Sequence, residues 1–132
     1  MSDAKRRLIR EFFATIARGE VPDTLVTPDM TFWSVNSGLA DRARFALGMK
    51  ALASIFGGTL TYEIDAFTAE DDRIVAEIRS HGTLVSGEAF ANTHVFLFHI
   101  RDGRVASAKE YMNQFAVREK ILPLLQAAMA RG

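Results

Sequence analysis

The residues of this chain best suited to chemistry lie between His81 and Asn113, in two consecutive β-hairpin patterns. Histidine side chains titrate near neutral pH and can act as general acids or bases. The pairs Ser86-Gly87 and Asp102-Gly103 have the composition of two-residue hairpin loops, which fix the strand register. This register predicts a polar cluster on one face of a sheet, formed by Arg79, His81, Asn92, His94, Tyr111 and Asn113.

Within this cluster, His94 and His81 are the candidate catalytic residues, since either can move a proton. Tyr111 and Asn113 can hydrogen-bond and orient a ligand carbonyl, and Arg79 can pair with a ligand carboxylate. Each role has a structural alternative. The histidines can simply line a wall, the amide and phenol can satisfy groups inside the protein, and the arginine can pair with a neighbouring acid.

The same face becomes apolar towards Phe98, and a pocket that holds an apolar ligand by one polar end has this distribution. The candidate ligand-binding residues are Asn92, Tyr111, Asn113, Arg79, Phe32, Ser34, Phe56, Phe96, Phe98 and Phe12. Small and aliphatic residues are expected on the opposite face, where a second subunit can pack; they are Ile74, Ala76, Ile78, Gly82, Ala89, Ala91, Thr93, Val95, Leu97 and Ala108. A slip of one residue in either loop would turn a strand over and disperse the cluster.

The elements that must position these residues follow from the hydrophobic periodicity. Apolar residues at helical spacing predict helices over 3–18 and 41–56, with Ser2 or Asp3 and Asp41 as N-caps. A period of two predicts strands over 59–68, 73–85, 88–101 and 104–113, after an earlier strand over 30–35. Residues 22–28 are expected to form a short helical turn and a loop. The last helix is expected over 115–129, with a local irregularity at Pro123.

Composition limits the function classes. The 132 residues fit one domain, residues 1–132, and Lys+Arg and Asp+Glu each number 16, so no net charge draws the chain to nucleic acid or to anionic membranes. No apolar run is long enough to span a bilayer, and the N-terminus does not resemble a secretory signal. We therefore expect a soluble cytoplasmic protein that binds neither nucleic acid nor membranes.

Metal and thiol chemistry have little support in the sequence. The chain has no cysteine, which removes disulfides, thiol nucleophiles and thiolate ligands. His81 and His94 are expected on neighbouring strands, but no carboxylate joins them in the same row, whereas zinc needs three or four ligands. We expect no metal and no cofactor.

The chain resembles members of the nuclear transport factor 2-like superfamily, especially its SnoaL-like (polyketide cyclase) branch. The segments that carry the resemblance are the initial helix, PDMTFWSVN before the second helix and HVFLFHIRDGRVASAKEYMNQF, in which an aromatic strand, a D-G-R turn and an E-Y-x-N ending follow one another. The resemblance implies an α+β cone-shaped sheet packed on three or four helices, with a pocket inside the cone. It also implies a homodimer that forms through the outer face of the sheet.

The resemblance is specific for fold and poor for activity, since the superfamily includes isomerases, dehydratases, cyclases, epoxide hydrolases and non-catalytic binders. For ketosteroid isomerases, the base, tyrosine and acid positions fall near Ser34, in the Phe12 region and near Phe96, none of which can do that chemistry. The final aspartate of limonene epoxide hydrolases and the acid of SnoaL-type cyclases match Asn113. A polar pair of scytalone dehydratases matches Asn92 and His94, although this chain lacks their second histidine.

Three functions remain open from the sequence. The first is a cofactor-independent isomerase, dehydratase or cyclase that acts on a small, largely apolar carbonyl or hydroxyl compound. Here His94, with or without His81, would move the proton. The second is a pocket protein that binds a small apolar ligand without turnover. The third is a dimeric accessory domain with a vestigial pocket.

Overall fold

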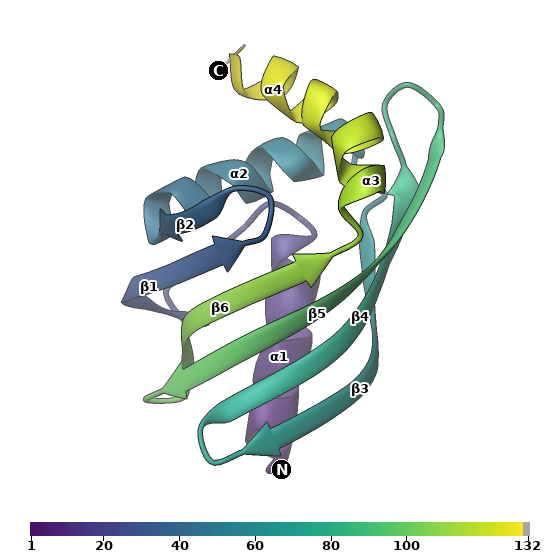
Figure 1. The fold of residues 1–132 in the computed structure, drawn as a ribbon. Helices are drawn as coiled ribbons and strands as arrows, with labels where there is room; N and C mark the ends of the chain where they lie inside the picture. Colours follow the sequence, from purple (N-terminus) through teal and green to yellow (C-terminus); the bar gives the residue numbers. More distant parts are fainter. Residues whose placement is uncertain (131–132) are drawn as a thin grey trace.

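The first helix, α1 (Asp3–Ile16), begins at Ser2, whose hydroxyl accepts a hydrogen bond from the backbone N–H of Lys5. The computed structural model describes residues 1–130 and places this helix across one face of a sheet (Figure 1). Its buried stripe includes Phe12 and Phe13, whose rings pack edge-on against the ring of Phe98 on that sheet. The helical spacing of the apolar residues gives α1 one apolar face, and this face packs against the sheet.

The sheet has six strands and is open, which makes the architecture α+β. The strands are β1 (Val26–Ser34), β2 (Gly38–Asp41), β3 (Thr61–Glu70), β4 (Arg73–Thr83), β5 (Ala89–Arg101) and β6 (Arg104–Met112), and their order in the sheet is β2-β1-β6-β5-β4-β3. Neighbours are antiparallel except β1 and β6, which are parallel. The four-stranded meander predicted from the sequence is present, whereas β2 was not predicted and β1 begins inside the predicted 22–28 loop.

The other helices gather near one end of the sheet (Figure 1). Helix α2 (Arg42–Ile55) starts at Asp41, whose carboxylate accepts from the N–H of Arg44. The C-terminal segment is α3 (Gln114–Ala116), then a π-helical segment η1 (Val117–Ile121) and then α4 (Leu122–Ala130). Pro123 lacks an N–H and its ring crowds the carbonyl of Glu119 four residues earlier, which explains the widened turn just before it.

The connection between β4 and β5 overturns one predicted register. The loop has three residues instead of two, because the N–H of Leu84 donates to the carbonyl of Glu88, and Gly87 adopts a left-handed φ of 92°. Ser80 therefore pairs with Asn92, and His81 pairs with Ala91. The prediction that His81 faces Asn92 and Arg79 faces His94 is wrong by one residue, and this difference turns β4 over.

The connection between β5 and β6 contains the predicted two-residue turn, since Arg101 pairs with Arg104 and both turn residues have positive φ. The register nevertheless shifts between His99 and Ile100, where Ala106 is an extra residue on β6. Beyond this bulge His94 pairs with Met112, so the prediction that it faces Tyr111 is wrong. The bulge turns the far half of β6 over.

These two shifts redistribute the two faces of the sheet. Ile74, Ala76, Ile78 and Ala108, which were expected on the outer face, are buried on the inner face. Ala91, Thr93 and Val95 on β5 are exposed on the outer face, as predicted. Within residues 1–130, no helix is both long and apolar enough to cross a membrane.

Candidate functional site

A cavity of about 190 Å³ lies between the inner face of the sheet, α2 and the C-terminal helices. Most of its wall is apolar, and the helical part of the wall includes Phe45, Met49, Leu52, Ile121 and Leu125. The sheet contributes five polar residues, Ser34, Tyr62, Ser80, His94 and Glu110, while Asn36 and Ser37 come from the β1–β2 turn and Arg44 from α2. The volume lies below the roughly 300 Å³ at which typical ligand pockets begin, so the cavity suits a small ligand.

Three of these polar side chains form a hydrogen-bonded chain. His94 Nδ1 lies 2.6 Å from Glu110 Oε2, and His94 Nε2 lies 2.7 Å from Ser80 Oγ. The side chains of His94 and Glu110 are only 8% and 12% exposed, and Ser80 is buried. Each comes from a different strand of the meander, namely β4, β5 and β6.

The chemistry of the three groups sets the direction of the hydrogen bonds. An ionised carboxylate can only accept hydrogen bonds, so the Nδ1–H of His94 donates to Glu110. A neutral imidazole then has Nε2 as an acceptor, and the Ser80 hydroxyl donates to it. Glu110 thus holds the imidazole ring in place, and Nε2 is the nitrogen that can act as a base once Ser80 turns away.

Tyr62 adds a hydrogen-bond donor to the same cavity. Its ring centroid lies 6.1 Å from that of His94, and it pairs with Ser80 across β3 and β4. Burial, followed by the nearby charge of Glu110, raises the pKa of Tyr62 well above its ordinary value. The phenol therefore stays protonated at every physiological pH.

The Tyr62 hydroxyl is also not completely enclosed by protein. It forms no hydrogen bond with another residue in 1–130, yet none of the fully buried polar side-chain atoms in that range lacks a partner. The hydroxyl must therefore be accessible, and Tyr62 lines the cavity. A ligand oxygen in the cavity can accept its proton.

The structure divides the residues predicted from the sequence. Four of them, Phe32, Ser34, Phe56 and His94, line the cavity. Phe12, Phe96 and Phe98 are buried in the core beneath it and are not part of the wall. The sequence analysis assigned the side chains of β5 to the correct faces of the sheet, although it paired β5 with the wrong residues of β4 and β6.

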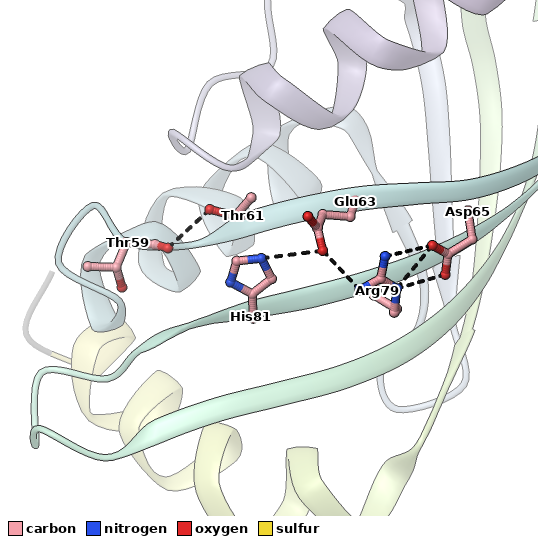
Figure 2. A network of polar contacts seen from close by, with 6 residues as sticks. All are labelled: Thr59, Thr61, Glu63, Asp65, Arg79 and His81. Carbon is pink, nitrogen blue, oxygen red and sulfur yellow. Dashed lines mark hydrogen bonds and ion pairs between the residues drawn. The ribbon is translucent and has the colours of Figure 1, made fainter.

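Arg79 and His81 lie on the outer face, in a network with β3 (Figure 2). Arg79 donates to both carboxylate oxygens of Asp65 and lies 3.0 Å from Glu63, while His81 Nε2 lies 3.6 Å from Glu63. The hydrogen bond and charge of Arg79 hold the pKa of Asp65 below its usual value. The prediction that Arg79 and His81 lie beside His94 in one inward cluster is wrong, because the three-residue loop turns the side chains of β4 to the opposite face.

Tyr111 and Asn113 also lie outside the cavity wall. Tyr111 is 46% exposed and packs against Trp33 on the outer face, with ring centroids 5.1 Å apart. The Asn113 side chain caps α3 by accepting from the N–H of Phe115, and the backbone carbonyl of Asn113 accepts from the side-chain amide of the buried Asn92. The predicted inward cluster therefore does not form, and Asn92 supports the end of β6.

The sequence analysis missed six polar residues of the wall, which are Asn36, Ser37, Arg44, Tyr62, Ser80 and Glu110. Glu110 stands first in the E-Y-x-N ending, which carries the family resemblance but showed no chemistry of its own. Ser80 would have faced inward with the 85–87 loop counted as three residues, whereas the inward position of Tyr62 also depends on the register shift between Ile64 and Ala66 on β3. Within residues 1–130, no group of three histidine or carboxylate side chains is arranged to hold a metal ion.

Comparisons with known proteins identify the family and the fold of the chain. The sequence model of the SnoaL-like domain matches residues 9–108. No curated protein matches the sequence significantly.

Several solved structures share the fold. An NTF2-like protein from Anabaena variabilis is 22% identical with a TM-score of 0.72, over 83% of this chain and 87% of its own. A putative SnoaL-like polyketide cyclase from Jannaschia is 19% identical with a TM-score of 0.70, over 92% and 95%. AclR from Streptomyces galilaeus, a putative hydroxylase, is 21% identical with a TM-score of 0.74, over 95% and 98%.

At these identities the solved structures show a common fold alone. The sequence model covers most of the chain, including the whole of β1 to β5. The chain therefore belongs to the SnoaL-like domain family and has the nuclear transport factor 2-like fold.

Proposed function

We propose that the protein is a cofactor-independent catalyst of proton transfer on a small, largely apolar carbonyl compound. The observation that carries the proposal is the His94–Glu110 pair, which opens into an apolar cavity with a protonated phenol beside it. A general base must reach the substrate, and a carboxylate behind it favours the imidazolium that forms. Isomerisation and dehydration both begin with such a step.

In this mechanism the substrate carbonyl accepts a hydrogen bond from the Tyr62 hydroxyl. Rotation of the Ser80 side chain frees Nε2 of His94, which then removes a proton from the carbon next to the carbonyl. The enolate oxygen is stabilised by Tyr62, much as an oxyanion donor acts in other enzymes. The imidazolium returns the proton to another carbon in an isomerisation, or to a departing hydroxyl in a dehydration.

Proton exchange tests this proposal with simple ketones in place of the natural substrate. A panel of small apolar ketones is incubated with the protein in D₂O, and deuterium incorporation next to the carbonyl is followed by NMR. We expect acceleration by the wild type and a loss of about 10²–10⁴-fold in His94→Gln, the range for a general base. Tyr62→Phe should lose about 10²-fold, the effect of one oxyanion donor.

Two other histidines provide matched controls. His99→Gln changes an exposed residue on the outer face and should leave exchange unchanged. His81→Gln discriminates between the sequence interpretation and the structure: a loss of exchange would restore His81 as a catalytic residue. Equal exchange in the wild type and His94→Gln would refute the enzymatic proposal.

A second candidate function is binding of a small apolar ligand without turnover. It is favoured by one observation, that both ring nitrogens of His94 already have protein partners. Native mass spectrometry of the purified protein would detect a retained ligand. A bound ligand together with no ketone exchange would select this function.

We further propose that a second copy of the chain covers the outer face of the sheet. Its support is the exposed apolar group on β5 and β6, where Val95 and Tyr111 are 38% and 46% exposed. Charged residues are depleted from the cores of such interfaces, so Val95→Asp should turn a dimer into a monomer in sedimentation velocity. A monomeric wild type would contradict this proposal.

A further inference from the structure

The chain of hydrogen bonds from Ser80 through His94 to Glu110 has the order of a nucleophile, a base and an orienting carboxylate. From this geometry we infer a second activity: the cleavage of small carboxylic esters through an acyl group carried on Ser80. Such triads are recognised by geometry and not by sequence position. The site is shared with the proposed proton transfer, but the chemistry is different.

The distances meet the requirement for an activated hydroxyl. A nucleophile and its base must lie within about 2.6–3.2 Å of each other, with a third group behind the base. Ser80 Oγ and His94 Nε2 are 2.7 Å apart, and His94 Nδ1 and Glu110 Oε2 are 2.6 Å apart. Both contacts therefore already have the lengths that the reaction requires.

The surroundings supply the other parts. Ser80 lines the cavity, so its hydroxyl can meet an acyl carbon there. Tyr62, the cross-strand neighbour of Ser80, offers a free O–H to the carbonyl oxygen. A cavity of about 190 Å³ with an apolar wall limits the acyl group to a short one.

The reaction balances with water as the only co-reactant. The Ser80 oxygen bonds to the acyl carbon and its proton passes to His94 Nε2, while Glu110 stabilises the imidazolium through Nδ1. The bond from carbon to the leaving oxygen breaks, and that oxygen takes the proton from His94. A water molecule then gives a proton to His94 Nε2 and attacks the acyl carbon. The bond between that carbon and Ser80 Oγ breaks, Oγ takes the proton from His94, and the carboxylic acid is released.

Trapping of the acyl group tests this inference. The wild-type protein is treated with p-nitrophenyl acetate, quenched in acid and analysed by intact mass and peptide mapping. We expect one acetyl group on the peptide that contains Ser80. The wild type should release p-nitrophenol from the ester at least about 100-fold faster than the Ser80→Ala variant does. His94→Gln and Glu110→Gln should also lose the adduct, and p-nitrophenyl octanoate should react much more slowly.

Controls separate this reaction from the nonspecific esterolysis of surface groups. Ser86→Ala removes an exposed serine of the 85–87 loop, and His99→Gln removes an exposed imidazole; neither should change the rate. Acetylation confined to other residues, or an equal rate in Ser80→Ala, would overturn the inference. Circular dichroism of each variant checks that the fold is kept.

The outcome is independent of the proton-transfer proposal because each is read on the wild type with its own substrate. Ketone exchange without an acyl-Ser80 adduct would refute the triad alone. An adduct without ketone exchange would refute the proton-transfer proposal alone.

Discussion

His94 Nδ1 and Glu110 Oε2 lie 2.6 Å apart although their backbones are not partners: His94 pairs with Met112, and Glu110 pairs with Phe96. The two side chains meet along a diagonal between adjacent strands, which long side chains can span. Because the pair is largely buried, removal of one partner leaves the other without its hydrogen bond and out of reach of bulk water.

Removal of the acceptor should destabilise the fold. Glu110→Ala leaves the Nδ1–H of His94 without an acceptor, and we expect the free energy of unfolding to fall by about 1.5–3 kcal/mol. Glu110→Gln keeps a carbonyl acceptor and should lose less. Urea denaturation followed by circular dichroism measures both, with Glu77→Gln, an exposed carboxylate of β4, as the control. An unchanged stability in Glu110→Ala would contradict the assigned hydrogen bond.

The close approach of Phe56 to β4 leaves no room for a side chain at Gly82. A Cβ added at Gly82 would lie 2.7 Å from Phe56 Cδ1 and 3.1 Å from the carbonyl oxygen of Thr59. Gly82→Ala should therefore lower the free energy of unfolding by about 1–3 kcal/mol, the usual cost of overpacking. Thermal and urea denaturation test this.

Gly48 provides the matched control on the cavity wall. It lies inside α2, and a Cβ added there meets nothing within 4 Å. Gly48→Ala should stabilise the protein by up to about 1 kcal/mol, because alanine favours the helix. If both alanine variants were destabilised equally, the difference in packing between these two positions would be wrong.

Tyr62 should make stability depend on alkaline pH. Its pKa is raised in the folded protein, so the folded state keeps the phenol proton after the unfolded chain begins to lose it. The contribution is complete below about pH 10, the unfolded value, and is lost as the pH rises above it. Urea denaturation at several alkaline pH values should show a steeper loss of stability in the wild type than in Tyr62→Phe. Parallel curves would contradict the raised pKa.

Asp65 should act at the other end of the pH scale. Arg79 lowers its pKa in the folded protein, so this stabilisation is complete above about pH 4, the unfolded value, and is lost as the pH falls through the lower folded value. Asp65→Asn should therefore reduce the acid dependence of stability. Because the pair is exposed, salt should weaken the effect in the wild type. An acid dependence equal in both proteins would contradict the pairing.

Most of the fold could be predicted from the sequence, because the spacing of apolar residues differs between helices and strands and can be recognised within a short segment. The N-caps Ser2 and Asp41 and the turn at Asp102-Gly103 are local signals, and the structure has each of them. Strand β2 escaped prediction because four residues are too few to show a period. Its pairing with β1 is a tertiary event.

The site was harder to predict because one extra residue in a loop or a bulge moves every later side chain of the strand to the opposite face of the sheet. The composition around Ser86 and Gly87 fits a hairpin loop of either two or three residues. The three-residue loop is favoured by contacts distant in sequence, since Leu84 is buried and the N–H of Val85 donates to the carbonyl of Ile55. The bulge at Ala106 has no sequence signal of its own. His94 survived both errors because β5, its own strand, was assigned to the correct face.

The extra residue at Ala106 also decides which chemistry the sixth strand can offer. With the bulge, the side chain of Glu110 points into the cavity. Without the bulge, the alternation of side chains along β6 would place Lys109 and Tyr111 on the inner face instead. A single-codon deletion could therefore exchange the reactive groups of this wall while every other side chain stayed the same. In this architecture, the loss of one residue at the bulge changes the groups on the wall without any substitution of a wall residue.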